Sequence, residues 1–265
     1  MPHRASPHPT HERDSPAALE LDSVAVEIAG SQILHDISLS VRTGEVVSVV
    51  GPSGCGKTTL LNVVAGLVPV SAGTATVDSA PITGPGPDRT VVFQEDAVFP
   101  WMTVAQNVAY ALALRRTPAD EQRRTVTDLL ELVGLGGRGA AWPKELSGGM
   151  RKRVDLARAF AARPKVLLMD EPYAALDQMT KQRLQQEFRN VVLSRTTTSM
   201  FVTHDLEEAI YVADRIVVMS ASPGRIAAVH DVPFGRDRSP GIRTSAAFQD
   251  LRRTLMAAFE EAEAA

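Results

Sequence analysis

A short apolar run that ends directly in a glycine-rich loop constrains the fold more than any other part of the sequence. The run Val46–Val50 is rich in β-branched residues, which is typical of a strand buried on both faces of a parallel sheet. The sequence that follows, GPSGCGKTT, matches the phosphate-binding pattern G-x-x-x-x-G-K-S/T. Strand, loop and lysine together predict a helix from about Lys57 to Leu67, with a phosphate-binding loop before it.

This loop is expected to bind the phosphates of a nucleotide. Backbone N–H groups at the positive end of a helix can meet the phosphate charges, and glycines permit the close approach. Lys57 is expected to reach the terminal phosphates, the Thr58 hydroxyl to ligate Mg²⁺, and Thr59 to support the neighbouring phosphate. The predicted phosphate-binding residues are Gly51, Pro52, Ser53, Gly54, Cys55, Gly56, Lys57, Thr58 and Thr59.

Cys55 is the only cysteine of the chain, so no internal disulfide can form. A reducing compartment is compatible with this composition. The helix N-terminus and Lys57 could lower the pKa of the Cys55 thiol. We favour the simpler interpretation that Cys55 is a small residue that fills the loop.

A second apolar run, VLLMDEP from Val166 to Pro172, places two carboxylates at the end of another buried strand. We expect Asp170 to hold a Mg²⁺-bound water and Glu171 to polarise the water that attacks the terminal phosphate. Two solvated acids in a loop are the alternative. The apolar residues immediately before them favour the strand end.

The order of strand and helix signals predicts an α/β fold with a helical insertion. β-Rich runs precede the first strong helix and predict an antiparallel opening, whereas later strands separated by helical stretches predict a parallel sheet covered on both faces. Helical patterns replace the strand signal between Ala105 and Phe160, so we predict an inserted helical subdomain at about 97–160. The other predicted strands are Leu19–Ile28, Ile37–Val41, Thr90–Phe93, Val166–Met169, Met200–Thr203 and Arg215–Met219.

Both ends of the chain differ from this body, which is predicted to span 19–233. Residues 1–18 are rich in proline, histidine and charge, lack an apolar signal-peptide core, and are expected to form a disordered tail. The histidines at 3, 8 and 11 are interpreted as solvated, although they could bind a metal weakly. Residues 234–265 form an extension with an amphipathic helix, whose stripe is expected to dock on its own domain rather than on a partner: Phe248, Leu251, Leu255 and Phe259.

The composition narrows the range of partners. The chain has 265 residues, of which 44% are hydrophobic and 22% charged, and its net charge is −3. Because nucleic-acid-binding domains usually carry a basic excess on one face, nucleic acid is not expected as a partner. No stretch is long and apolar enough to predict a membrane-spanning helix.

The sequence LSGGM, from Leu146 to Met150, lies about ninety positions after Lys57. With the two motifs above, it makes the region from Leu19 to Val229 resemble the ATPase subunit of an ATP-binding-cassette (ABC) transporter. The resemblance implies a RecA-like P-loop NTPase core, ATP and Mg²⁺ as ligands, and a helical subdomain that carries LSGGM. It also implies that Ser147 and Gly149 contact ATP held by the opposite subunit, so that each site needs two copies or a similar cassette partner.

Three further motifs fall in the order of this family. Gln94 resembles the glutamine that joins Mg²⁺ and links the core to the helical subdomain. The sequence AALD, from Ala174 to Asp177, resembles the loop that crosses between protomers and couples the two sites. His204 resembles the histidine that senses the γ-phosphate, so the resemblance implies Glu171, His204 and Gln94 as catalytic residues, and Thr58, Gln94 and Asp170 around the metal.

One position departs from the family pattern. The family usually places an aromatic residue near the start of the chain to stack on adenine, and alignment back from DISLSV puts Ile28 there. Stacking contributes about 1–3 kcal/mol per base, so its loss could weaken adenine binding by roughly tenfold or more. We therefore expect relaxed discrimination between ATP and GTP.

The resemblance also implies a membrane partner. In the family, a loop after Gln94 receives the transmembrane permease, and here it carries Phe99, Pro100, Trp101 and Met102. PWMTV, DEPYAALD and SASPGRI are most similar to importers of nitrate, sulfonates and taurine, which use a periplasmic or lipid-anchored binding protein. The implied location is the cytoplasmic face of the membrane, as a peripheral subunit. An exporter or lipid-trafficking ATPase remains an alternative, and so does a cassette ATPase without a transport role.

Overall fold

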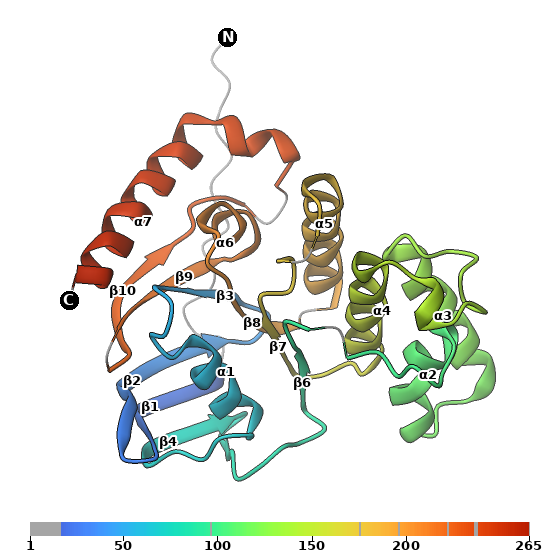
Figure 1. Cartoon of the computed structure of the whole chain (residues 1–265), viewed down its shortest axis with the longest axis horizontal. Helices are drawn as coiled ribbons and strands as arrows, with labels where there is room; N and C mark the ends of the chain where they lie inside the picture. Colours follow the sequence, from blue (N-terminus) through green and yellow to red (C-terminus); the bar gives the residue numbers. More distant parts are fainter. Residues whose placement is uncertain are drawn as a thin grey trace.

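Two β-sheets form the body of the molecule in the computed structural model, and helices surround them (Figure 1). The structure describes residues 17–95, 97–174, 176–195, 197–221, 223–235 and 238–264. A four-stranded antiparallel sheet has the order β2-β1-β4-β5, and a six-stranded sheet has the order β10-β9-β3-β8-β7-β6. The strands are β1 Ala17–Ile28, β2 Ser31–Arg42, β3 Val46–Val50, β4 Ala72–Val77, β5 Ala80–Pro81, β6 Arg89–Val92, β7 Val166–Asp170, β8 Thr198–Val202, β9 Arg215–Ser220 and β10 Arg225–Asp231.

The six-stranded sheet confirms the predicted α/β class. Its strands β9, β3, β8, β7 and β6 are parallel, and β10 joins the edge antiparallel to β9. Every residue of β3, β7 and β8 is buried, as expected for strands covered on both faces. Strands β4, β5 and β10 were not predicted, because their sequences carry small or polar residues without a clear apolar period.

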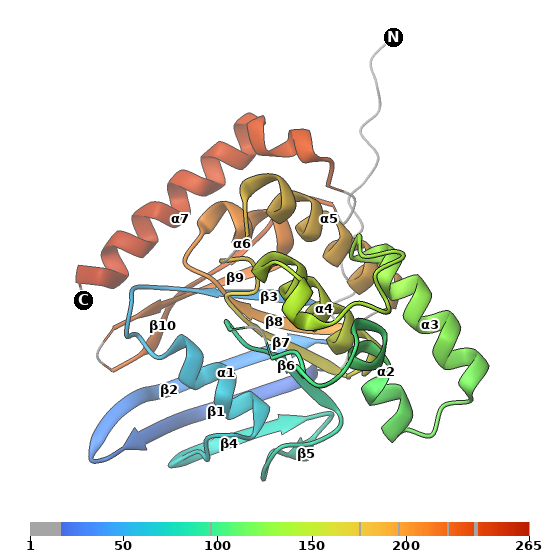
Figure 2. The ribbon, with the colours of Figure 1, turned by 45° about the vertical axis from the view of Figure 1, so that its right-hand side comes forward.

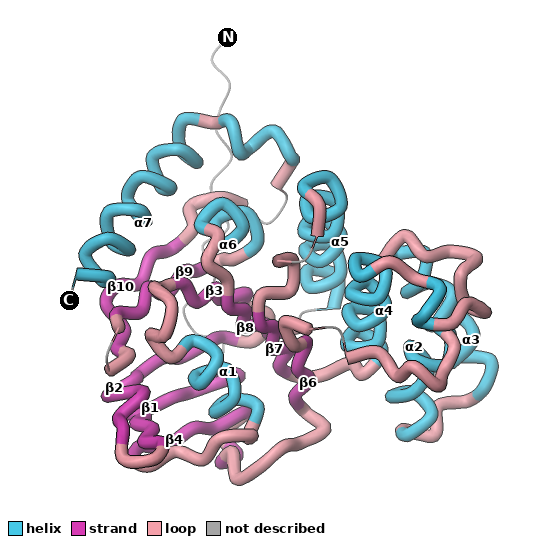
Figure 3. The backbone as a smooth tube through the Cα atoms, viewed as in Figure 1, coloured by secondary structure: helices cyan, strands magenta, loops and turns pink. Residues whose placement is uncertain are grey.

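The helices lie on both faces of the six-stranded sheet and beyond its β6 edge. They are α1 Lys57–Ala65, α2 Val104–Leu114, α3 Ala119–Leu132, α4 Gly148–Ala161, α5 Gln178–Arg195, α6 Leu206–Val212 and α7 Ala246–Ala264. Figure 3 shows α2, α3 and α4 grouped beyond β6. Helix α1 ends two residues before the predicted Leu67, because Gly66 adopts a left-handed conformation with φ +77° and its N–H closes the helix onto carbonyls of its last turn.

Two apolar clusters fix the layers. Val47 and Val49 of β3 pack with α1 and the four-stranded sheet, so α1 lies in the cluster that joins the two sheets. Val46 and Val50 point the other way, into the cluster that contains α6 and α7. The helix that follows the glycine-rich loop is therefore held by packing on both sheets.

The C-terminal helix packs on the body of its own chain. Phe248 and Leu255 of the predicted stripe are fully buried, and the Phe248 ring stacks 6.0 Å from that of Phe234. Figure 2 shows α7 on the same side of the six-stranded sheet as α6, away from the four-stranded sheet. At the other end, Ala17 and Ala18 already belong to β1 rather than to the predicted tail; the remainder of that tail, with its histidines, lies outside the described residues.

Candidate functional site

Four parallel strands deliver the predicted residues to one edge of the sheet. The carboxyl ends of neighbouring parallel strands meet at the same edge, where open α/β sheets bind ligands. Because β3, β8, β7 and β6 are consecutive neighbours, their following loops lie side by side. These loops carry the glycine-rich segment after β3, His204 after β8, Glu171 after β7 and Gln94 after β6.

The glycine-rich segment forms a continuous loop from Gly51 to the start of α1. Gly56 caps α1 with φ +91°, and a side chain there would meet Leu34 at 2.7 Å, so glycine is required. The ammonium group of Lys57 folds over the loop and donates to the carbonyl oxygens of Gly51 and Pro52, at 2.8 Å each. The hydrogen bonds of Lys57 therefore hold the two ends of the loop together.

Cys55 is fully buried in this loop. Burial raises the pKa of its thiol more than the charge of Lys57 lowers it. The structure therefore supports the loop-filling interpretation and contradicts a lowered thiol pKa.

Gly224, in the loop after β9, supports the phosphate loop from behind. A Cβ atom at Gly224 would lie 2.1 Å from the Cys55 carbonyl oxygen, a distance that no side chain tolerates. Its N–H donates to Ile33, and its carbonyl accepts from His35. In the sequence, Gly224 belongs to the motif SASPGRI, which does not by itself indicate a contact with the phosphate loop. The Pro-Gly pair at 223–224 signals a turn, but nothing local indicates what that turn touches.

Glu171 lies between the other two predicted catalytic residues. One carboxylate oxygen is 3.1 Å from Nδ1 of His204, and the other accepts from the Gln94 side chain at 3.4 Å. Glu171 has φ +44°, a left-handed conformation that is unusual for a residue with a side chain. Its N–H donates to Val202 of β8, which holds this conformation.

Asp170 is the last residue of β7 and is buried beside the start of α1. Burial raises the pKa of its carboxyl group, and a hydrogen bond from Thr58 and the charge of Lys57 oppose this increase. The hydroxyl of Thr58 and the carboxylate of Asp170 thus lie near each other, and both offer oxygen ligands of the kind that Mg²⁺ prefers. Gln94 can add an amide oxygen, so this donor set fits Mg²⁺ shared with nucleotide phosphates.

The residues assigned to a second subunit's nucleotide lie apart from this cluster. Ser147 caps α4, where its hydroxyl accepts from Met150, and Ser147 is exposed. Within the described ranges, no hydrogen bond or ion pair joins Ser147 or Gly149 to the phosphate loop. Asp177 accepts hydrogen bonds at the start of α5 from Thr180, which lower the pKa of its carboxyl group.

A partly buried ion cluster, not predicted from the sequence, joins α5 to the loop of His204. Lys181 contacts Asp205 at 2.6 Å and Glu208 at 3.0 Å, and Asp205 caps α6 directly after His204. Burial raises the pKa of Glu208 to about 7 against the opposing effect of Lys181. The cluster connects the helix that follows Asp177 to the segment that carries His204.

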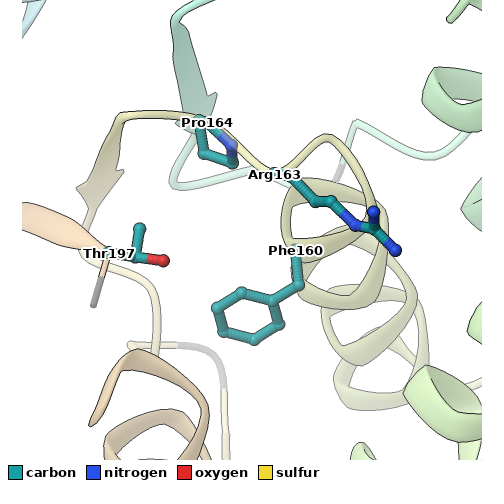
Figure 4. Close-up of a pocket in the computed structure, with 4 residues that line it drawn as sticks. All are labelled: Phe160, Arg163, Pro164 and Thr197. Carbon is teal, nitrogen blue, oxygen red and sulfur yellow. The ribbon is translucent and has the colours of Figure 1, made fainter. Parts of the chain in front are cut away.

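Two cavities lie near these elements but outside the phosphate loop. One, of about 400 Å³, is lined by Phe160, Arg163, Pro164 and Thr197, at the amino ends of β7 and β8 and so opposite the catalytic edge (Figure 4). The other, of about 510 Å³, lies between His204 and α7. Neither coincides with the phosphate-binding loop.

Ile28 occupies the end of the β1–β2 hairpin, paired with Ser31, and is 47% exposed. Ile33 of the same hairpin lies against Gly56 of the phosphate loop. An aliphatic side chain thus stands on the hairpin where the resemblance would place an aromatic one.

Ile28→Tyr is predicted to tighten ATP binding by roughly tenfold, because a phenol ring can stack on the base. Calorimetric titration of the wild type and variant with ATP and with GTP measures this effect. Val229→Tyr is a matched control, since Val229 is also 47% exposed on a strand. A large preference of the wild type for ATP over GTP would contradict the proposed weak base site.

No helix among the described ranges is long and apolar enough to cross a membrane. A family model described as "ABC transporter" matches residues 34–174. The chain is 44% identical over 254 residues to the taurine import ATP-binding protein TauB of Mesorhizobium japonicum, covering 93% of this chain and 99% of the relative. It is 42% identical over 235 residues to the aliphatic sulfonates import ATP-binding protein SsuB of Bacillus licheniformis, covering 88% and 89%.

Solved structures agree with this family. The structure resembles cbiO1 of Clostridium perfringens, part of the ABC transporter complex cbiONQ, with a TM-score of 0.75 and 25% identity, covering 90% of this chain and 95% of the other. It also resembles the ATP-binding cassette MJ0796 in a dimeric post-hydrolysis state bound to ADP and Pi, with a TM-score of 0.72 and 28% identity, covering 82% and 99%. The chain belongs to the ABC transporter family. It is an ATP-binding subunit that hydrolyses ATP to drive transport.

Proposed function

We propose that this ATPase energises the import of a small organic anion of the taurine or aliphatic sulfonate class. The observation that carries the proposal is the 42–44% identity, over nearly the whole length of each protein, to subunits named for taurine and aliphatic sulfonate import. The motifs PWMTV and SASPGRI support the same group. The proposed site of this chain binds the nucleotide, so the transported anion would be recognised by a permease and a binding protein.

In the proposed reaction, Glu171 polarises the attacking water. Gln94 and His204 contact its two carboxylate oxygens and orient them. The loop amides and Lys57 bind the triphosphate. Thr58 and Asp170 would hold Mg²⁺, which would supply positive charge to neutralise the phosphates. Preorganised donors of this kind stabilise the charge that develops in the transition state.

Two copies are proposed to clamp two ATP molecules, each held by one copy's phosphate loop and the other's Ser147 and Gly149. The solved dimer bound to ADP and Pi supports this arrangement as an analogy. A C2 pair presents the same surfaces twice, which fits one phosphate loop and one LSGGM per chain.

A cluster of aromatic side chains is proposed to receive the permease. Trp101 is 68% exposed and stacks on Phe99 at 5.5 Å, and Tyr110 packs edge-on against Phe99 at 4.9 Å. Phe99 itself is half-buried beneath Arg158. Exposed aromatic side chains that pack on a half-buried one are typical of binding surfaces.

Glu171→Gln is predicted to bind ATP with little change but to lose hydrolysis by about 10²-fold or more, because general-base catalysis contributes roughly this factor. The variant should accumulate a dimer in ATP, measured by light scattering after gel filtration. Glu260→Gln, an exposed change near the C-terminus, is the control and should keep the wild-type rate. Unchanged turnover in Glu171→Gln would contradict the assigned role.

Growth on single sulfur sources tests the cargo class. Deletion of the gene from its host is predicted to stop growth on taurine or an alkane sulfonate, with growth on sulfate unaffected. The wild-type gene should restore growth, whereas the Glu171→Gln gene should not. Normal growth of the deletion strain on all of these sulfonates would reject the proposed class, while the ATPase assignment would stand.

A further inference from the structure

Two cationic side chains of helix α4 contact residues that follow β6: Phe93, Gln94, Ala97 and Phe99. Lys152 is buried, and its ammonium group donates to the carbonyl oxygens of Phe93 and of Gln94, the latter at 3.1 Å. Arg158 donates to the Ala97 carbonyl at 2.6 Å and lies over the Phe99 ring at 4.8 Å. The backbone of Gln94 is therefore fixed to α4 rather than only to its own strand.

The same helix begins at Ser147. The Ser147 hydroxyl accepts from Met150, and its carbonyl accepts from Arg151 at 2.9 Å, so Ser147 is joined to the first turn. Lys152 follows five residues later, a rise of about 7.5 Å along the helix axis. Because a hydrogen-bonded helix moves largely as a unit, a displacement at Ser147 displaces Lys152.

Through Gln94, Lys152 is also connected to the predicted catalytic residues. The Gln94 side chain donates to Glu171, whose second oxygen contacts His204. A continuous series of contacts thus runs from Ser147 through α4 to the hydrolytic carboxylate.

We propose that Lys152 is a positioning residue that couples the two ATP sites of the dimer. When Ser147 docks on the nucleotide held by the partner, α4 moves, and Lys152 transmits that movement to Gln94 and Glu171 of its own site. The inference rests on the proposed composite sites, because Ser147 must touch a nucleotide held by another copy. Through Lys152, the rate of ATP hydrolysis in one site of the dimer would depend on whether the other ATP site is closed.

A double-mutant cycle on the purified full chain tests this coupling, with kcat and KM for MgATP as the measurements. Lys152→Met keeps the length of the side chain and removes its donors. Ser147→Asp keeps a good helix N-cap but repels a nucleotide phosphate. Lys144→Met is the matched control, since Lys144 is an exposed lysine in the segment just before Ser147.

Each single variant, Lys152→Met and Ser147→Asp, is expected to lower kcat by about tenfold or more, with a much smaller change in KM. The double variant should be no slower than the slower single variant, because both changes interrupt one path. Lys144→Met should keep the wild-type kcat. Gel filtration and thermal unfolding confirm that each variant is folded. If Lys152→Met does not fold, Lys152→Gln replaces it; this variant keeps a donor, and we expect a smaller loss of kcat with the same non-additivity.

Two results separate the inference from the proposed function beneath it. If the losses of kcat in the two single variants multiply in the double variant, the coupling role is wrong, although the composite site is unaffected. An unchanged kcat in the Lys152 variant would have the same meaning. An unchanged kcat in Ser147→Asp would instead contradict the composite site itself. A merely structural role of Lys152 would lower the unfolding temperature without producing non-additivity toward Ser147.

Discussion

The contact of Glu171 with both His204 and Gln94 depends on the parallel pairing of three strands, β6, β7 and β8, and the proposed chemistry depends on that contact. The three residues are far apart in the sequence, yet each follows a strand whose carboxyl end lies at one edge of the sheet. Alternate residues of β3, β7 and β8 pack into two different apolar clusters, so a one-residue slip would exchange the packing partners of every side chain. The geometry of the site is thus a consequence of the core.

Two of the loops at this edge of the sheet are also attached to helices that lie beside the site, α4 and α5. Gln94 is attached to α4 by Lys152, and the His204 loop is attached to α5 by Lys181 and Asp205. In both cases a lysine joins a loop of the site to a helix. Helix α4 begins directly after Ser147, and α5 begins directly after Asp177. Both residues are predicted to lie where the two copies of the dimer meet. Closure of a dimer would therefore act on Glu171 through two helices of the same chain.

Much of this site could be predicted from the sequence, because its residues follow apolar runs directly. The phosphate loop follows β3 and Glu171 follows β7, so strand pattern and position were sufficient. Lys152 and Gly224 could not be found in the same way, since their partners, at Gln94 and Cys55, are distant in the sequence and no local period marks them. Strands β4 and β10 were missed for a related reason: they lack the continuous apolar runs by which the central strands were predicted.

The central claim is that each ATP lies between the phosphate loop of one copy and Ser147 of another, and cross-linking between two single-cysteine chains of different size tests it directly. One chain carries Ser53→Cys and the other Ser147→Cys, both with Cys55→Ala and Glu171→Gln, and a short thiol-specific cross-linker is added to their mixture. The account predicts a covalent heterodimer that forms with ATP and not without nucleotide. A heterodimer yield that is independent of ATP, or the absence of any heterodimer when ATP is bound, would contradict it.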